Sequence, residues 1–247
     1  MASNFDCIGL GVSNEAELGD LVVRLASAAK ERLVTDAGEY AIWRSRTGAE
    51  LWVHLGPVEG GDETEREIIG VTPFFEGRSE VLLNLDEVIK RPDDNSHEGA
   101  FQGWVCHDTD DDLGAYSLIF DAVDFAAHAG LPLPALRHVR LTGFARAIVV
   151  SDDAAIEGQK SFCTTGTSVG RQASPAASGT TGAFLTGRVK EFASLLNEAT
   201  GEQFMWLFVD SWLASFDIVA DPAVIAGEIS LGATVQIDCA MFGRIID

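Results

Sequence analysis

The sequence is poor in basic residues. Lysine and arginine together number 17, against 38 aspartates and glutamates, so the formal net charge is −21 at neutral pH. A chain with this charge repels phosphate backbones and anionic lipid surfaces at long range, and no cluster of lysines or arginines offsets the repulsion. The composition therefore argues against nucleic acid and membranes as partners. It favours a protein partner, in particular a basic one, or a small molecule.

Long apolar runs and paired cysteines are also missing. No apolar stretch approaches the ~18 residues that a membrane-spanning helix needs, and the N-terminal residues lack the basic and apolar regions of a secretory signal. The four cysteines are scattered, with no C-x-x-C pair and no histidine at zinc-finger spacing. We therefore expect a cytoplasmic protein whose cysteines serve as core side chains.

The motifs of several common active sites are absent from the sequence. There is no phosphate-binding G-x-x-x-x-G-K-[ST] loop, no G-x-S-x-G nucleophile motif and no H-E-x-x-H metal motif. Gly9 and Gly11 begin a dinucleotide-binding fingerprint, but Asn14 stands where the third glycine belongs. No cofactor is predicted on this basis, and a bound divalent metal ion is kept as the alternative.

Hydrophobic periodicity indicates one helix and many strands. An apolar stripe with spacings of three and four runs through residues 13–33, where Ser13 or Asn14 can cap a helix. Most other apolar segments are short or alternate with polar residues, as strands do. The pattern predicts an α+β fold that is β-rich, with mostly antiparallel sheets, one clear N-terminal helix and a small barrel-like unit at the C-terminus.

Composition divides the chain into three segments. Residues 1–156 are expected to form an α+β domain that starts with the element order βαβββ. Residues 157–183 are rich in glycine, serine and threonine, which is typical of a linker or a mobile loop. Residues 184–247 combine aromatic residues with strand patterns and predict an OB-like β unit.

The order strand, helix, strand, strand, strand over residues 5–77 resembles one module of the vicinal oxygen chelate superfamily, which includes glyoxalase I and bleomycin-resistance proteins. The stretches that match its first and last strands are "FDCIGLGV" and "IIGVTPFFEG". The resemblance implies an open cup around a divalent metal ion, with ligands from those two strands. In this sequence they offer Asp6 or Cys7, and Glu76.

Residues 184–247 resemble an OB-like barrel. Such a barrel needs glycines where its strands bend, and three are suitably placed: Gly187, Gly232 and Gly243. The segment also carries aromatic residues with acidic neighbours, among them Trp206 beside Glu202 and Asp210. Because base-stacking sites need a cationic groove, we expect the aromatic side chains in the core or at a protein interface.

The stretch "HDTDDDLGAY" places Asp108, Asp110 and Asp112 at the first, third and fifth positions of a calcium loop. The glycine of such a loop comes one position late, at Gly114, and the twelfth position is Ile119 instead of glutamate. The strands on either side favour a solvated hairpin loop, with weak cation binding as the alternative.

His54 is the histidine with the most suggestive surroundings. It shares a predicted strand face with Trp52 and Glu50, and Glu76 ends the last strand of the same module. A pair of His54 and Glu76 on the sheet surface could act as acid and base or hold one cation. The candidate ligand-binding residues are therefore His54, Glu76 and Trp52, and the alternative is an ordinary, half-exposed sheet residue.

Two functions follow from this sequence. The first is a binding protein without catalysis, which takes a protein partner or a small ligand. The second is a metal-assisted enzyme of the vicinal oxygen chelate type that acts on a small molecule through Glu76 and His54. Single-strand binding by the OB-like unit is a third possibility, for which the acidic charge is unfavourable.

Overall fold

The computed structural model describes residues 3–58, 60, 62, 65–105, 114–151, 158–164 and 180–246. Its helical elements are η1 (Asp6–Ile8), α1 (Glu15–Ala28), α2 (Phe125–His128) and η3 (Pro222–Val224). The strands of the first part are β1 (Glu31–Thr35), β2 (Gly38–Arg44), β3 (Ala49–Pro57), β4 (Arg66–Phe75), β5 (Val81–Ile89), β6 (Ala100–Val105), β7 (Tyr116–Ala122) and β8 (Ala135–Ser151). The remaining strands are β9 (Ser161–Thr164), β10 (Gly182–Leu196), β11 (Gln203–Asp210), β12 (Ser215–Ala220), β13 (Ile225–Ala226) and β14 (Thr234–Ile245).

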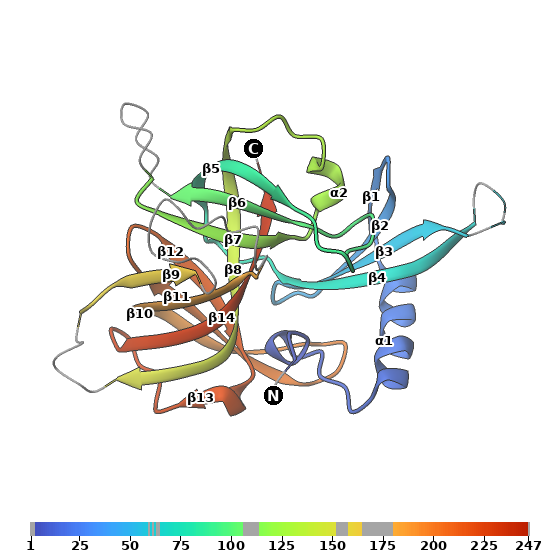
Figure 1. The fold of residues 1–247 in the computed structure, drawn as a ribbon. Coiled ribbons are helices and arrows are strands. Elements are labelled where there is room, and N and C mark those ends of the chain that lie inside the picture. The colour runs from blue at the N-terminus through green and yellow to red at the C-terminus, as the bar shows by residue number, and fades with distance from the viewer. Residues whose placement is uncertain are drawn as a thin grey trace.

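The predicted fold class is confirmed, because the chain is β-rich and mostly antiparallel, with α1 as its one long helix. Strands β1 to β4 form an antiparallel sheet in sequence order. Helix α1 packs Leu21, Val22 and Leu25 against this sheet (Figure 1). The predicted hairpin of β2 and β3 is present, and Pro73 lies in β4 at the sheet edge, where a missing N–H group is tolerated.

The other strands form a sheet that closes into two rings. The first ring runs β5–β6–β7–β14–β8 and returns to β5, and the second runs β10–β11–β12–β8–β14 and returns to β10. Both rings share the antiparallel pair of β8 and β14, which runs through the centre of Figure 1. Each ring contains one parallel pairing, β7 with β14 in the first and β12 with β8 in the second.

The two rings are related by a pseudo-twofold arrangement of strands. Strands β5 to β8 have the same mutual pairings as β10, β11, β12 and β14. The axis passes through the pair Thr142 and Phe242, because Asp121 pairs with Phe242 while Asp217 pairs with Thr142. The two aspartates lie in similar sequences, "FDAVD" from Phe120 and "FDIVAD" from Phe216. The strands of residues 182–245 thus repeat the arrangement of the strands of residues 81–151.

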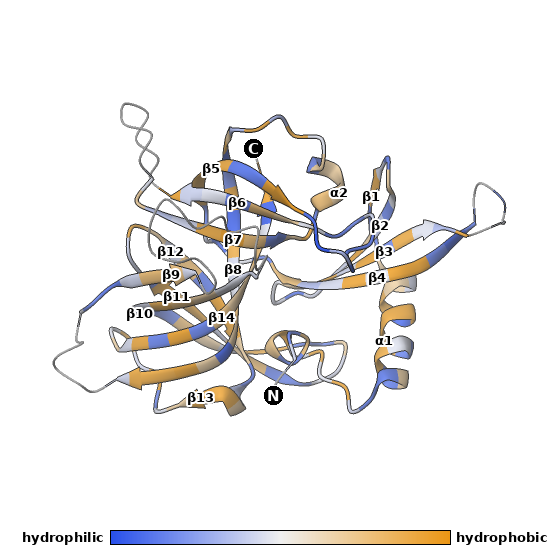
Figure 2. Cartoon of the chain, in the orientation of Figure 1, coloured by the Kyte–Doolittle hydropathy of each residue, from blue (hydrophilic) through white to orange (hydrophobic). Residues whose placement is uncertain are grey.

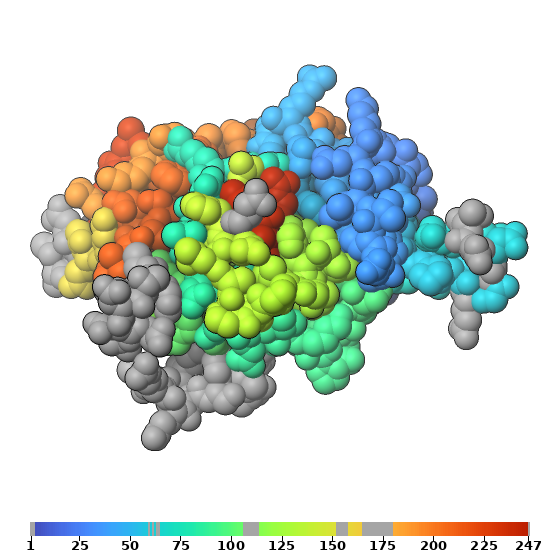
Figure 3. Space-filling view, turned by 90° about the horizontal axis from the view of Figure 1, so that it is seen from above, coloured from blue at the N-terminus to red at the C-terminus, as the bar shows by residue number. Residues whose placement is uncertain are grey.

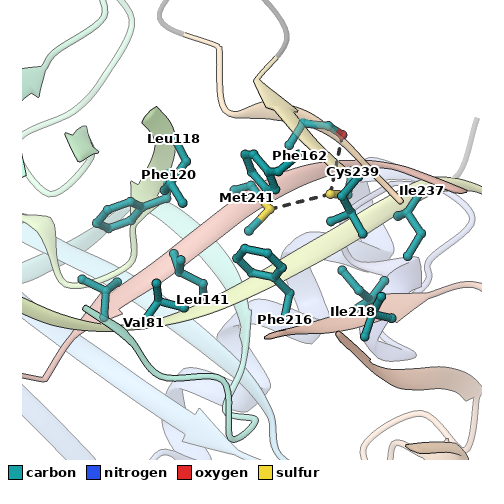
Figure 4. Close-up of a cluster of buried hydrophobic side chains, with 14 of the residues drawn as sticks. Val81, Leu118, Phe120, Leu141, Phe162, Phe216, Ile218, Ile237, Cys239 and Met241 are labelled. Carbon is teal, nitrogen blue, oxygen red and sulfur yellow. Dashed lines mark hydrogen bonds between the residues drawn. The ribbon is translucent and has the colours of Figure 1, made fainter. Parts of the chain in front are cut away.

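The interior of the rings is one continuous apolar cluster. Figure 4 shows side chains from both rings meeting around β14, where Cys239 donates to the carbonyl of Ala183 over 3.7 Å and lies 3.7 Å from the Met241 sulfur. Figure 2 shows β4 as hydrophobic where it crosses α1 and hydrophilic toward its projecting end. Cys7 and Cys239 are buried free thiols, in agreement with the predicted place of the cysteines in the core, but Cys163 in β9 is exposed and departs from that prediction.

The predicted first strand at residues 5–12 is wrong. This segment contains η1 and a turn at Gly9, whose φ of 67° is left-handed. Its carbonyl groups are satisfied by side chains instead of a neighbouring strand: Asn197 donates to Ile8 over 2.8 Å and Thr200 donates to Gly9 over 2.6 Å. The module therefore begins with a helical turn, and the observed order is helix followed by four strands.

The predicted helix is too long at its C-terminal end. Asn14 caps α1 as expected and accepts from the backbone of Glu17 over 3.0 Å, but the helix ends at Ala28. The next residues form β1, because "ERLVT" pairs with β2. The side chain of Arg32 reaches back and donates to the Ala26 carbonyl at the helix end, over 3.3 Å.

The segment 184–247 does not close a ring by itself. It supplies β11, β12, β14 and most of β10, while β8 from the preceding segment provides the fifth strand of the second ring. The expected boundary between two units at 157–183 lies for the most part outside the described residues. The described strands on either side of that boundary share hydrogen bonds and one core.

The close packing of β7 and β8 side chains against β14 predicts that Gly243 tolerates no side chain. A Cβ atom there would overlap the ring of Phe120 and lie 3.0 Å from Val139. We expect Gly243→Ala to lower the free energy of unfolding by about 1–3 kcal/mol, the usual cost of overpacking a core. Urea denaturation followed by tryptophan fluorescence measures this change.

Gly19→Ala is the matched control for the Gly243 substitution. Gly19 lies in α1 and a Cβ atom there meets nothing within 4 Å. The same added methyl group should stabilise the helix by about 0.5–1 kcal/mol. Equal effects of the two substitutions would contradict the packing described for the shared strands.

Candidate functional site

The strand face that carries Glu50, Trp52 and His54 is buried, and not half-exposed as expected. The exposed fraction is 0% for Glu50 and 1% for His54. The opposite face of the sheet packs on α1, while this face is covered by residues 95–99 and α2. Tyr40 joins these layers, because its hydroxyl donates to the His97 carbonyl over 2.8 Å and accepts from the Ala126 amide over 3.0 Å.

Glu76 lies in a cluster of arginines at the junction of the two sheets. It accepts hydrogen bonds from Arg140 of β8 and from Arg244 of β14, the latter over 2.6 Å. Arg44 of β2 approaches it to 3.0 Å and also binds Glu50, with 2.5 Å between Nε and Oε1. These ion pairs tie the end of β4 to the outer face of the two rings.

The expected pair of His54 and Glu76 is not formed. Glu76 contacts Glu50, and His54 lies four residues further along β3, which corresponds to about 13 Å in an extended strand. Trp52 lies between them, and its indole N–H donates to Glu50 over 2.7 Å. The structure thus separates the three predicted ligand-binding residues into an arginine cluster and a histidine cluster.

Glu50 and Glu76 have opposite pKa shifts. Burial, together with the hydrogen bond to Glu76, raises the pKa of Glu50 to about 7, although Trp52 and Arg44 partly offset the shift. Burial alone would raise the pKa of Glu76, but the hydrogen bond from Glu50 and the charges of Arg244 and Arg44 lower it below its usual range. Glu50 is therefore the carboxyl of this pair that takes up a proton first as the pH falls.

His54 packs against a second histidine. The rings of His54 and His97 are stacked, with 5.4 Å between their centroids. Burial and the neighbouring His97 lower the pKa of His54 to about 3, so its ring is neutral at physiological pH. Its Nε2 atom lies 3.2 Å from the Thr72 hydroxyl and its Nδ1 atom 3.7 Å from a Glu98 carboxylate oxygen.

Thr72 and Glu98 line a cleft between the two sheets. The cleft has a volume of about 460 Å³. Its walls come from β4, from the β5–β6 connection, from β7 and β14, and from the N-terminal segment: Ser3, Asn4, Phe5, Val71, Thr72, Pro73, Arg91, Asp94, Glu98, Gly99, Asp121, Ala122 and Phe242. His54 is not part of the lining, but its Nε2 atom contacts the hydroxyl of Thr72, which is.

The polar wall of the cleft is acidic. Asp94, Glu98 and Asp121 supply three carboxyl groups, and Arg91 is the one cation in the described lining. Arg91 lies 2.7 Å from Asp121 and 3.6 Å from Asp94. Burial raises the pKa values of Glu98 and Asp121, although Arg91 and the Thr181 hydroxyl, 3.0 Å from Asp121, partly offset the shift of the latter.

Figure 3 shows how the parts that build the cleft are arranged. The four-stranded sheet and α1, in blue and cyan, form one end of the molecule and pack directly against the yellow-green segment that contains α2. Helix α2 begins directly after β7, so Asp121 and the covering layer of the histidine cluster belong to one continuous stretch. A site between two sheets is a common place for a ligand.

No group of three or more histidine, cysteine, aspartate or glutamate side chains could hold a metal ion among the residues that the structure describes. The predicted weak cation ligands Asp108, Asp110 and Asp112 lie outside the described residues, so that prediction stays untested. The vicinal oxygen chelate resemblance, which implies Asp6 or Cys7 and Glu76 as metal ligands, stays a prediction. The carboxylate of Glu76 already accepts hydrogen bonds from Arg140 and Arg244.

Sequence reasoning missed the cleft because its residues are distant in the chain. Arg91, Asp94 and Glu98 belong to the segment "RPDDNSHEG", which reads as a solvated loop. Asp121 sits in a strand that looks like ordinary core. The repeat of "FDAVD" as "FDIVAD" was the available signal, since it marks Asp121 and Asp217 as related positions.

Comparison with protein-family models, with curated proteins and with solved structures finds no match to this chain. Within the described part of the chain, no helix combines the length and the apolar character required to span a bilayer.

The raised pKa of Glu50 predicts a pH-dependent stability. The unfolded carboxyl titrates near 4.5 and the folded one near 7, so the contribution of Glu50 to stability falls as pH rises from about 4.5 to about 7. Glu50→Gln places a neutral side chain here, whose one oxygen can accept from Trp52, while the hydrogen bond from Arg44 is lost at every pH and lowers stability by a constant amount. We expect this variant to lose part of the pH dependence and to gain relative stability at pH 8.

Urea midpoints at pH 5, 6, 7 and 8 measure this effect. The pKa of Glu76 is shifted downward, so its own titration contributes mainly below this range. An unchanged slope in Glu50→Gln would show that Glu50 is ionised in the folded protein throughout the range.

Proposed function

We propose that the protein is a binding protein whose cleft takes a small molecule with a positively charged nitrogen. The observation that carries this proposal is the convergence of Asp94, Glu98 and Asp121 on one cleft that also has an apolar wall. The apolar wall is supplied by Phe5, Val71, Pro73, Ala122 and Phe242. Convergent polar groups in a mostly apolar concavity are the usual composition of a ligand site.

Charge supports a cationic ligand over an anionic one. Three carboxyl groups face one guanidinium in the described lining, and the whole chain has a formal charge of −21. The long-range field attracts small cations, and the partly desolvated carboxyls of Glu98 and Asp121 gain from a counter-charge that replaces water. An acidic binding protein of this kind fits the partner class expected from composition.

Binding without catalysis is the better supported of the two expected functions. A metal-assisted reaction through His54 and Glu76 would need both side chains at one centre, and they lie in separate clusters. His54 is buried behind Thr72 and is neutral, so it serves to hold the cleft wall. The acid–base pair of Glu50 and Glu76 is closed in by arginines and Trp52.

Calorimetric titration with small primary amines tests the proposal, after a thermal-shift screen that includes the matching carboxylic acids. We expect amines to bind and acids not to bind, with affinity that falls at higher ionic strength. Asp121→Asn should weaken amine binding by about tenfold, since it removes one carboxylate from the cleft. Affinity should also fall as pH is lowered, because the raised pKa values of Glu98 and Asp121 bring their protonation closer to neutral pH.

Asp20→Asn is the control that removes the same charge from an exposed position of α1. It should leave amine affinity unchanged apart from a small long-range effect. Absence of amine binding by the wild-type protein, or an equal loss in the two variants, would contradict the proposal.

A further inference from the structure

The pseudo-twofold arrangement gives Asp121 a counterpart, Asp217, whose surroundings are filled. Asp217 is 1% exposed and accepts three hydrogen bonds. The backbone amides of Arg78 and Ser79 donate to its Oδ2 atom over 2.7 and 2.6 Å, and the indole N–H of Trp206 donates to Oδ1 over 2.7 Å. The guanidinium of Arg78 lies over the Trp206 ring, 5.2 Å from its centroid. In the second ring, the aspartate carboxylate is thus surrounded by one aromatic N–H donor and two main-chain N–H groups.

The contact made by Ser79 has a direct equivalent at Asp121. Val81 pairs with Val139 and Ala183 with Cys239, each three residues before the axis pair of Thr142 and Phe242. Val81 and Ala183 are therefore equivalent, and so are Ser79 and Thr181, which lie two residues before them. Both donate to the aspartate of the opposite repeat, Ser79 through its amide and Thr181 through its hydroxyl over 3.0 Å.

The contact made by Trp206 has no such equivalent. Phe208 pairs with Asp217 and Ala100 pairs with Asp121. Two residues before these partners lie Trp206 in the second ring and Glu98 in the first. A carboxyl group thus stands where the other ring has an indole, and the space beside it belongs to the cleft of about 460 Å³.

We infer that the cleft binds an amine cation that carries a planar aromatic ring with an N–H group, and that this ring takes in the first ring of strands the place that the Trp206 side chain takes in the second. This inference rests on the proposed function, because it names the chemical class of the cation. The ligand ring lies against Pro73 and Phe242, one N–H group donates to Asp121, and the charged nitrogen faces Glu98.

Asp121 can accept this additional donor although Arg91 and Thr181 already contact it. A carboxylate offers about four acceptor positions on its two oxygens, and Asp217 shows that one oxygen accepts two N–H groups here. Glu98 holds the position in the first ring that Trp206 holds in the second. Its carboxyl group has no use for a neutral indole, but it can pair with a positively charged group of the ligand. Together these features favour a ligand that combines an aromatic N–H donor with a separate ammonium group over a simple aliphatic amine.

Calorimetry with the purified protein distinguishes this class from simple amines. Tryptamine carries a ring N–H, an aromatic surface and an ammonium group, while butylamine carries only the ammonium group. We expect tryptamine to bind about tenfold or more tightly than butylamine, given the extra apolar area buried, and indole-3-acetate not to bind. Equal affinities for tryptamine and butylamine would overturn the aromatic inference and leave the proposed function standing. Absence of binding by both amines would overturn the two proposals together.

The substitution Glu98→Trp gives the first ring the indole side chain that Trp206 provides at the equivalent position of the second ring. The new indole should fill the cleft, donate to Asp121 and reduce tryptamine affinity at least tenfold beyond the loss in Glu98→Gln, which removes the charge but leaves the space open. Circular dichroism and the urea midpoint establish that the variants are folded. If Glu98→Trp fails to fold, the ligand comparison in the wild-type protein still decides the inference. Equal tryptamine affinity in folded Glu98→Trp and Glu98→Gln would overturn it.

Discussion

The antiparallel ladder between β8 and β14 is the interaction on which the rest of the structure depends. Twelve residue pairs join these strands, and both rings close through them. Their inner faces supply the common core, in which Cys239 and Met241 lie. Their outer faces carry the four-stranded sheet, because Thr142 donates to the Phe75 carbonyl over 2.9 Å and Arg140 and Arg244 bind Glu76. The cleft exists because the two sheets meet along this outer surface without filling it.

Most strands could be predicted from the sequence, because alternation of polar and apolar residues reports local burial. The β2–β3 hairpin, its pairing with β4 and most of the later strands follow from such patterns. The segment 5–12 is as apolar as a strand, yet its partners are the side chains of Asn197 and Thr200, nearly two hundred residues away. Pattern also cannot show that β14 pairs with both β8 and β7, since ring closure depends on non-local contacts.

The candidate site could be predicted only in part. Its polar neighbours on one strand face single out His54, and this residue does contact the cleft wall through Thr72. Its predicted partner Glu76 is instead bound by arginines from β2, β8 and β14, which no local pattern connects with it. The carboxyls of the cleft come from a polar connection and from a strand, so their convergence depends on the register between β6 and β7, in which Ala100 pairs with Asp121. That register is tertiary information.

The parallel pairing in each ring has a consequence for the order in which the chain can assemble. The first ring contains β5 to β8 but closes only when β14, the last strand in the sequence, has inserted between β7 and β8. During synthesis on the ribosome, β7 and β8 therefore present open hydrogen-bonding edges until β14 has emerged. Closure of both rings consequently waits for β14, and the excess of acidic residues over basic ones opposes contacts between open edges of different chains until then.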